Sequence, residues 1–248
     1  MNHLSMDTAT EVLSVALRVD AGAGAGRYLT VCDAGLRHTR NLMPLVDGLL
    51  ASAGIAPRDL ELVSCMRGPG SFTGLRIGMA SAKGIAAAID PAQPPLISIS
   101  TLDVMAAAVA APESLVIPVI DGKKGRFYGA AYLGGRRLTE DMDLPAGDLL
   151  AAALAADEHT QGPRPSIVAT GPHAARFAEL LTAADPPVPN VPVVVDPGAR
   201  SGWAATLLEL AEQRLPAMGY DSIDQGPTYV RRSDAEIARG AGTGSRQR

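Results

Sequence analysis

The sequence predicts an α/β protein made of two lobes that share one order of elements. The first hundred residues contain three strand-like runs followed by helix, strand, helix and strand, which is the order of a ribonuclease-H-like lobe. The second half repeats this order, and each half opens with an apolar run that ends on an aspartate, Asp7 or Asp121. A chain of 248 residues is long enough for two cores of roughly 100 residues each. We therefore expect two duplicated lobes with a cleft between them.

The elements of the first lobe follow from apolar periodicity and turn residues. Gly54 ends the first predicted helix, and a cluster of prolines at residues 91–95 ends the second. The predicted strands are 4–8, 13–19, 28–32, 60–66 and 96–99, and the predicted helices are 41–53 and 73–89.

The second half is read in the same way, with a final helix added. Its predicted strands are 115–121, 127–133, 137–142, 166–169 and 191–195, and its predicted helices are 147–155, 172–181 and 202–214. We divide the chain into an N-terminal lobe (1–100) that carries partner-docking helices, a C-terminal lobe with a returning segment (101–237), and a flexible Gly-, Ser- and Arg-rich tail (238–248).

Composition narrows the classes of protein. No apolar run approaches the ~20 residues that span a bilayer, and the start has neither the basic nor the apolar region of a signal peptide, so we expect a cytoplasmic protein without membrane contact. The net charge of −4 argues against a stand-alone tRNA binder, which needs a concentrated basic face. Cys32 and Cys65 both lie in strand-like runs and are interpreted as small buried residues.

A glycine-rich segment at residues 68–78 follows a predicted strand and opens a predicted helix. A helix N-terminus offers free backbone N–H groups to an anion, and Ser71 or Thr73 can cap it. The segment is not a P-loop, because Gly74 is not followed by Lys-Ser or Lys-Thr, and it matches neither the dinucleotide fingerprint nor a nucleophile elbow. On composition alone, an anion-binding loop and a purely structural loop both stay open.

Taken together, five segments resemble the TsaB (YeaZ) family, small paralogues of the threonylcarbamoyltransferase TsaD within the TsaD/Gcp-like superfamily. They are residues 4–17, 38–50, 68–84, 118–128 and 227–231, and the glycine-rich segment is the most specific of them. At Gly122 and Lys123 the match is loose, because the family usually has Ala-Arg there.

The resemblance implies an actin-like ATPase (ASKHA) fold and an accessory role. Such a subunit is required for N6-threonylcarbamoylation of adenosine 37 in ANN-decoding tRNAs and acts by binding the catalytic paralogue TsaD. The resemblance also implies a third protein, the ATPase TsaE, and contact with tRNA only through the complex.

The resemblance further implies that this chain is not itself an enzyme. The catalytic paralogue holds its metal through a His-x-x-x-His pair, and the aligned positions here are Thr101 and Met105. Neither residue suits a hard or borderline cation. The four histidines (His3, His38, His159 and His173) have no metal-binding spacing, so we expect no metal site.

Several residues are nevertheless candidates to face a nucleotide or phosphate in an actin-like cleft. The turn Asp-Thr-Ala-Thr lacks the glycine of a phosphate turn, so we expect no cofactor of the chain's own and leave ATP or ADP with Mg to the level of the complex. The candidates are Asp7, Thr8, Thr10, Gly68, Gly70, Ser71, Thr73, Arg76 and Asp121.

The two N-terminal helices are predicted to dock a partner. Apolar residues of helix 41–53 cover an arc of about 160°, wider than the ~100° that packing on one sheet requires, and helix 73–89 is apolar or small nearly all round. We expect Val46 and Leu49 to be exposed in the free subunit; internal core packing is the alternative. The predicted interface residues are Leu42, Leu45, Val46, Leu49, Gly74, Ile77, Gly78 and Ala82.

Two other functions stay open at this point. One is an independent small-molecule kinase or ATPase of the same fold, which would need an acid pair for metal and a true phosphate turn. The other is a homodimeric regulatory protein, because the same helix surface could pair with itself when the subunit is alone.

Overall fold

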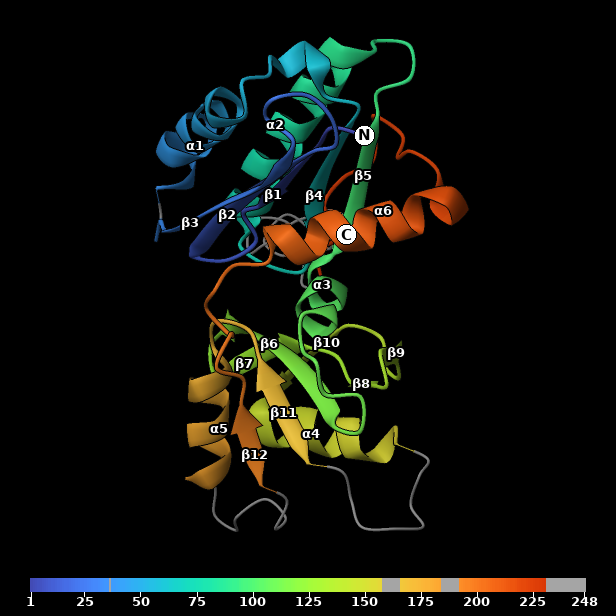
Figure 1. Ribbon diagram of the computed structural model, residues 1–248. Helices are drawn as coiled ribbons and strands as arrows, with labels where there is room; N and C mark the ends of the chain where they lie inside the picture. Colours follow the sequence, from blue (N-terminus) through green and yellow to red (C-terminus); the bar gives the residue numbers. More distant parts are fainter. Residues whose placement is uncertain (36, 158–165, 184–191, 231–248) are drawn as a thin grey trace, which may run out of the picture.

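The computed structural model describes residues 1–35, 37–157, 166–183 and 192–230. They form two lobes, each built on one mixed sheet (Figure 1). The N-terminal sheet has the order β3-β2-β1-β4-β5, in which β1 to β3 are antiparallel and β4 and β5 run parallel to β1. Its strands are β1 (His3–Asp7), β2 (Val12–Val19), β3 (Gly26–Asp33), β4 (Leu62–Gly68) and β5 (Leu96–Ser100).

The C-terminal sheet repeats this order as β10-β7-β6-β11-β12, which confirms the predicted duplication. Its strands are β6 (Leu115–Lys123), β7 (Arg126–Gly129), β10 (Met142–Pro145), β11 (Ile167–Thr170) and β12 (Val193–Val195). The strand predicted at 127–133 is broken after Gly129, and its second part, β8 (Tyr132–Leu133), pairs with the other end of β6 and with β9 (Arg136–Arg137).

Helices cover the sheets unequally. In the N-terminal lobe, α1 (His38–Ala53) and α2 (Phe72–Ile89) lie on one face of the sheet, with the short 3-10 turn η1 (Pro57–Asp59) after α1. In the C-terminal lobe, α4 (Ala146–Ala155) and α5 (Ala174–Thr182) take the equivalent places, and α3 (Thr101–Ala107) connects the lobes. No helix in the described ranges combines the length and apolarity needed to cross a bilayer.

The last helix, α6 (Ala204–Met218), leaves the C-terminal lobe and crosses back to cover the second face of the N-terminal sheet (Figure 1). Its apolar side buries Leu207, Leu208 and Ala211, and the Ser14 hydroxyl of β2 accepts the backbone N–H groups of Trp203 and Ala204 at 3.1 and 3.0 Å. The helix predicted at 202–214 is therefore confirmed, and it completes the N-terminal core.

A half-buried charge cluster joins the two lobes around Asp103 of α3. Its carboxylate accepts hydrogen bonds from the Tyr132 hydroxyl (2.6 Å), Arg137 (2.9 Å) and Arg214 (2.7 Å), which come from β8, β9 and α6. Desolvation raises the pKa of Asp103, but the hydrogen bonds from Tyr132 and Arg214 outweigh it, so the net shift is downward. The carboxylate thus stays charged and ties α6 to the C-terminal lobe.

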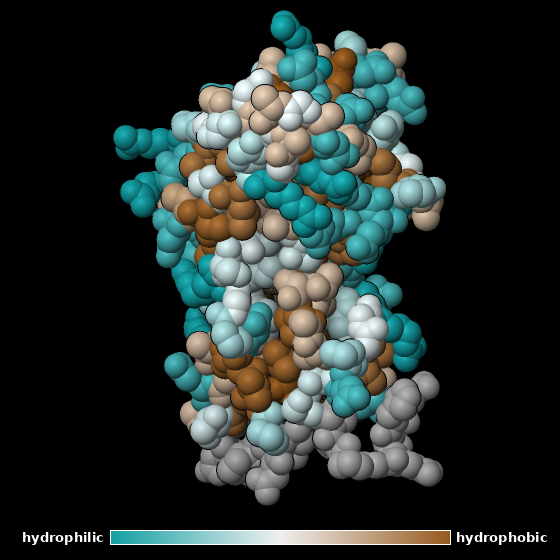
Figure 2. Space-filling model, in the orientation of Figure 1, coloured by the Kyte–Doolittle hydropathy of each residue, from teal (hydrophilic) through white to brown (hydrophobic). Residues whose placement is uncertain are grey.

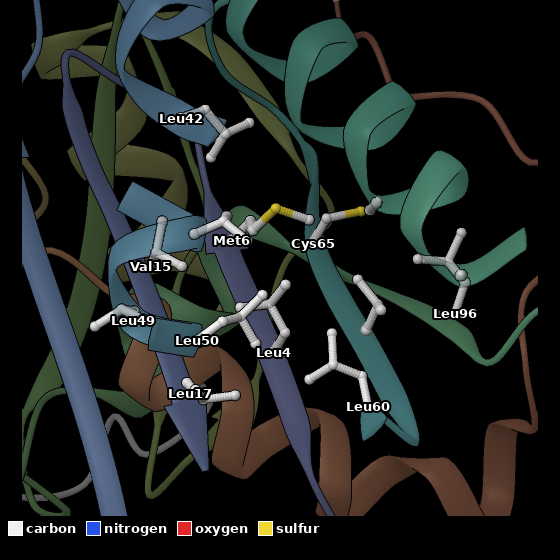
Figure 3. Packing of buried hydrophobic residues seen from close by; sticks show 14 of the residues in the cluster. Leu4, Met6, Val15, Leu17, Leu42, Leu49, Leu50, Leu60, Cys65 and Leu96 are labelled. Atoms are coloured by element: carbon white, nitrogen blue, oxygen red, sulfur yellow. The ribbon is translucent and has the colours of Figure 1, made fainter. Parts of the chain in front are cut away.

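The structure corrects our expectation for the docking residues of α1. Leu42 and Leu49 point into the N-terminal core with Leu4 and Val15 (Figure 3). Val46 belongs to the same cluster, and the exposed fractions of Val46 and Leu49 are only 1% and 6%. The expectation that these two residues are exposed in the free subunit is wrong. α1 contacts both the sheet and α2, so its buried arc is wider than packing on a sheet alone would require.

The predicted interface positions of α2 are also mostly internal. Gly74 and Gly78 are buried against Thr8 of the β1–β2 turn, and Ala82 is buried in the N-terminal core, whereas Ile77 of α2 and Leu45 of α1 are half-buried. The small residues allow α2 to approach the β1–β2 turn instead of a partner helix.

Candidate functional site

A cavity of about 430 Å³ lies between the two lobes. Three N-terminal segments line it: the β1–β2 turn, the start of α1 and the start of α2. The C-terminal lobe contributes the end of β6, β7 and the loop before α5. The lining residues are Ala9, Thr10, Glu11, Gly35, His38, Gly70, Ser71, Phe72, Thr73, Ile120, Asp121, Gly122, Lys123, Tyr128 and His173.

The start of α2 is built for close approach, as the glycine-rich segment predicts. The Ser71 side chain caps the helix by accepting the N–H of Gly74 at 3.2 Å, which confirms the predicted cap. The backbone N–H of Ser71 donates to Ala9 O at 2.7 Å, and a Cβ on Gly70 would lie 2.4 Å from the same oxygen. The first turn of α2 is thus held against the β1–β2 turn, with Thr73 at the cavity.

Asp7, one of the two predicted acids, does not reach this cavity. It is fully buried and accepts hydrogen bonds from the Ala9 N–H (3.1 Å) and the Ser14 hydroxyl (3.4 Å). Burial raises the pKa of Asp7 to about 6, although hydrogen bonds from Ala9, Trp203 and Ser14 oppose the shift. Asp7 therefore organises the N-terminal core.

Thr8, Gly68 and Arg76 also lie outside the cavity lining. The Thr8 hydroxyl donates to Gly74 O at 2.8 Å, and Gly68 packs under Thr228 of the returning segment. Arg76 stacks on the ring of Phe72 at 3.8 Å and donates to the Tyr229 hydroxyl at 3.0 Å. These three residues are thus not part of the cavity lining, and a role of theirs toward a phosphate stays a prediction.

Asp121, the second predicted acid, does line the cavity. Lys123 binds it through its backbone N–H (2.8 Å) and its ammonium group (3.4 Å), and Arg176 of α5 donates to it at 2.7 Å. Desolvation raises the pKa of Asp121, but the Lys123 N–H and the charges of Lys123 and Arg176 outweigh it and lower the pKa. Thr10, Gly70, Ser71 and Thr73 are the other predicted residues found here.

Residue-type reasoning missed the pair that closes the cavity, Glu11 and His173. The ring nitrogen Nε2 of His173 lies 3.6 Å from Glu11 Oε1, and Nδ1 accepts the backbone N–H of Asp121 at 3.1 Å. Arg200 adds a second bond to Glu11 at 2.9 Å. Glu11 directly follows the predicted turn and His173 follows Gly171-Pro172, but only the fold brings the two side chains together.

The positions aligned with the metal ligands of the catalytic paralogue hold core residues. Thr101 and Met105 of α3 are both fully buried, and Met105 packs in the cluster with Leu102, Val104 and Ile120. Within the described residues, no group of three or more His, Cys, Asp or Glu side chains could hold a metal ion. In the same part of the chain, Cys65 is buried and Cys32 half-buried, and both are free thiols.

The cavity lining combines the start of a helix with charged side chains. The N–H groups of Ser71 and Gly74 at the start of α2 are used within the protein, while Lys123 brings a positive charge to the cavity and Glu11 and Asp121 bring negative charge. Both carboxylates are already bound by cations, so the cavity is mixed in charge.

Comparison with known proteins places these features in one family. The family model described as "TsaD: tRNA N6-adenosine threonylcarbamoyltransferase" matches residues 33–191. The chain is 37% identical over 134 residues to the tRNA threonylcarbamoyladenosine biosynthesis protein TsaB of Escherichia coli, covering 53% of this chain and 55% of that protein. It is 32% identical over 196 residues to an uncharacterized protein of Mycobacterium tuberculosis, covering 77% and 89%.

Comparison with solved structures gives the same family resemblance. YeaZ from Pseudomonas aeruginosa superimposes with a TM-score of 0.70 at 25% sequence identity, covering 92% of this chain and 99% of that one. Together with the duplicated sheet order, this confirms the actin-like fold. The sequence match to the curated TsaB relatives spans only about half of their length, 55% for Escherichia coli and 59% for Bacillus subtilis.

Proposed function

The chain belongs to the TsaD family of tRNA N6-adenosine threonylcarbamoyltransferases, and from that premise we propose that it is an accessory, non-catalytic subunit in threonylcarbamoyladenosine biosynthesis. It binds the catalytic paralogue TsaD and supports transfer to adenosine 37 of tRNA without performing the transfer. The relatives named TsaB biosynthesis proteins support this assignment.

One observation carries the non-catalytic role. Thr101 and Met105 replace the family's metal-binding histidines, and both side chains are fully buried in a packed core. A hydroxyl and a thioether in that setting cannot supply the nitrogen ligands that the paralogue uses. The face of α3 that would hold the metal is here part of the hydrophobic core.

The outer face of α1 and α2 is the docking surface in this proposal. Once the buried residues are set aside, this surface comprises half-buried Leu45 and Ile77 with exposed Met43, Ala80 and Gly84. These are apolar or small side chains on two neighbouring helices, which suits packing against a helix pair of a partner.

Reconstitution tests the role. tRNA, threonylcarbamoyl-AMP, TsaD and TsaE are combined with or without this protein, and threonylcarbamoyladenosine is measured. We expect modification only when TsaD and this protein are both present. Transfer by this protein without TsaD, with any metal, would overturn the non-catalytic role; full activity of TsaD without it would overturn the accessory role.

The docking surface is tested by Ala80→Glu, with Ala175→Glu on α5 as the matched control. Both alanines are exposed on helices, so neither change should lower the melting temperature appreciably. We expect Ala80→Glu to weaken co-elution with TsaD roughly tenfold or more, because it buries an unpaired charge in the interface. Equal co-elution of both variants would place the interface elsewhere.

The interlobe cavity favours one alternative, a stand-alone kinase or ATPase. Ser71, Thr73 and Asp121 line it at the place where actin-like folds divide into lobes. Steady ATP turnover by the pure protein, abolished by Asp121→Asn, would favour this alternative. In the accessory role, nucleotide and Mg belong to the complex, and the isolated protein turns over no ATP.

Contact with tRNA and residence in the cytoplasm are part of the same proposal. The net charge of −4 predicts weak, salt-sensitive binding of tRNA by the isolated protein, with most phosphate contacts supplied by the other subunits. Filter binding at physiological salt measures this, and submicromolar affinity would contradict it.

A further inference from the structure

A second pocket lies between the lobes, where β4 and β5 end. Figure 2 shows the molecule narrowing at the level where the lobes meet, and in Figure 1 β5 leads into α3 at this level. The pocket has a volume of about 450 Å³ and shares no lining residue with the cavity that Asp121 lines. The carboxyl ends of parallel strands are the usual place for a ligand in α/β folds. β4 contributes Arg67, β5 contributes Ser100, and the segment from β9 to β10 contributes Arg137, Glu140 and Asp141.

Ser100 brings an unbonded hydroxyl group to this pocket. The residue is only 8% exposed, and its Oγ has no hydrogen-bond partner among the described residues. Ser100 stands at the N-cap position of α3, but its hydroxyl does not cap the helix. The next residue, Thr101, is fully buried, and its Oγ1 is likewise unbonded within the described part of the chain. A buried hydroxyl without a partner costs free energy, so this pair of hydroxyls indicates a place for a polar ligand.

The pocket also contains a cation and an anion that do not pair with each other. Arg67 is half-buried, and within residues 1–35, 37–157, 166–183 and 192–230 its guanidinium forms no ion pair or hydrogen bond. Glu140 is exposed and is unpaired within the same ranges. Arg137, in contrast, binds Asp103 at 2.9 Å and also binds Asp141. Arg67 and Glu140 therefore keep their charges available to a ligand.

These groups suit a small zwitterion better than a simple anion or cation. A ligand that carries only a carboxylate or a phosphate would bind Arg67, but Glu140 and Asp141 would repel it. An amine without an acid group would leave Arg67 unpaired. A guanidinium binds a carboxylate through two parallel N–H groups, and a carboxylate binds an ammonium group through charge-assisted hydrogen bonds. The Ser100 hydroxyl can donate to the ligand's carboxylate or accept from its ammonium group.

From this set of unpaired groups we infer that the pocket binds a small α-amino acid. Arg67 binds the carboxylate of the ligand, Glu140 binds its ammonium group, and the Ser100 hydroxyl bonds to one of the two. Because Arg67 belongs to the N-terminal lobe and Glu140 to the C-terminal lobe, the bound ligand also connects the lobes. This inference goes beyond the proposed function and does not depend on it.

Three small molecules of similar size test the requirement for both charges. The full-length, isotope-labelled protein is titrated at constant ionic strength with α-aminobutyrate, butyrate or propylamine up to about 100 mM, and amide chemical shifts are recorded. We expect α-aminobutyrate to saturate the site. Butyrate and propylamine should each bind at least roughly tenfold more weakly, because each lacks one charge-assisted contact. Butyrate that binds as tightly as α-aminobutyrate, or α-aminobutyrate that does not saturate, would overturn the inference.

Two glycine amides report which pocket is filled. Gly68 lines the pocket at the ends of β4 and β5, whereas Gly122 lines the cavity at Asp121. On titration with α-aminobutyrate, we expect a saturating change of chemical shift at Gly68 and little change at Gly122. The reverse result would assign the ligand to the other cavity and would contradict the inference.

Substitutions test the role of each group. Arg67→Met should weaken binding of α-aminobutyrate at least roughly tenfold, whereas Arg136→Met should leave it unchanged, because Arg136 is exposed and does not line the pocket. Glu140→Gln should weaken binding of α-aminobutyrate but not of butyrate, since only the former carries an ammonium group. Wild-type affinity in Arg67→Met, or equal losses in Arg67→Met and Arg136→Met, would overturn the assignment.

Ser100→Ala separates binding from folding. The wild-type hydroxyl is buried and unbonded within the described part of the chain, so its removal should not lower the melting temperature. Affinity for α-aminobutyrate should nevertheless fall several-fold, because the ligand loses a hydrogen bond. A lower melting temperature with unchanged affinity would show that the hydroxyl serves the fold, and would contradict its role in the site.

Discussion

The β1–β2 turn and the β6–β7 turn occupy equivalent places in the two lobes but have opposite environments. Each follows the first strand of its lobe, and each carries the aspartate that ends or nearly ends that strand, Asp7 or Asp121. Asp7 is enclosed, with a pKa raised to about 6, whereas Asp121 lies at the interlobe cavity, where the Lys123 N–H and the charges of Lys123 and Arg176 lower its pKa. The same topology thus gives one acid enclosed in the N-terminal core and one ion-paired acid at the cavity, whose side chain is 5% exposed.

The difference arises from how closely a helix approaches each turn. In the N-terminal lobe, Gly74 and Gly78 let α2 touch the turn, and Thr8 bonds to Gly74 O. In the C-terminal lobe, the equivalent strands continue into a tight two-residue turn at Lys124 and Gly125, both with positive φ (55° and 74°), which carries the chain past the cavity. A duplicated fold therefore need not have two equivalent sites.

The substitution with the largest expected effect disrupts the contact between α2 and the β1–β2 turn. A Cβ on Gly78 would lie 2.1 Å from the Thr8 hydroxyl oxygen, so Gly78→Ala should lower the free energy of unfolding by about 3 kcal/mol. The matched control is Gly84→Ala on the same helix, where a Cβ meets nothing within 4 Å; it should stabilise by about 1 kcal/mol. Urea unfolding measures both, and similar effects would show that α2 does not depend on this contact.

The second-largest expected effect is a difference between Asp7 and Asp121 in how their contributions to stability depend on pH. The pKa of Asp7 is raised on folding, so its contribution to stability is present below about pH 4 and is lost as pH rises through about 6. Relative to Asp7→Asn, the wild-type protein should gain about 2 kcal/mol between pH 7 and pH 4.

The contribution of Asp121 to stability should change with pH in the opposite direction. Its pKa is lowered on folding, so its contribution is present at neutral pH and is lost as the solution is acidified. The wild-type protein should therefore lose stability relative to Asp121→Asn over the same range. Two parallel profiles in urea unfolding would mean that the two turns have the same environment after all.

The smallest expected effect is that of removing the charge of Asp121 at neutral pH. Both cations that bind Asp121, Lys123 and Arg176, are more than half exposed, so Asp121→Asn should cost less than about 1 kcal/mol at pH 7. Thermal unfolding checks this. A loss above about 2 kcal/mol would show that Asp121 is as structural as Asp7.

Much of the fold could be predicted from the sequence because periodicity and turn residues act locally. The strands of the N-terminal lobe, the Gly54 end of α1 and the Ser71 cap of α2 each depend on a few neighbouring residues. The break after Gly129 could not be predicted, because residues 127–133 are uniformly apolar. Which end of β6 each part pairs with depends on contacts far away in the sequence. The predicted tail at 238–248, His159 and Val191 lie outside the described residues.

For the candidate site, local chemistry identified the glycine-rich start of α2 but not which side chains face the cavity. Thr10, Ser71, Thr73 and Asp121 line it as expected, while Asp7, Thr8 and Arg76 turn to internal partners. Residue type states what a side chain can bind. Its actual partner depends on which groups the fold brings within hydrogen-bond distance.

By itself, the sequence determined the duplicated order of elements, the family, and the absence of histidines at positions 101 and 105, since each is a property of residue identity and spacing. Only the tertiary structure decided that Val46 and Leu49 belong to the core, that α6 covers the N-terminal sheet, and that Glu11 meets His173. The physical reason is common to all three. Residue type shows that an apolar helix face must be buried and that a carboxylate needs a partner. Long-range packing decides which surface covers the helix face and which group binds the carboxylate.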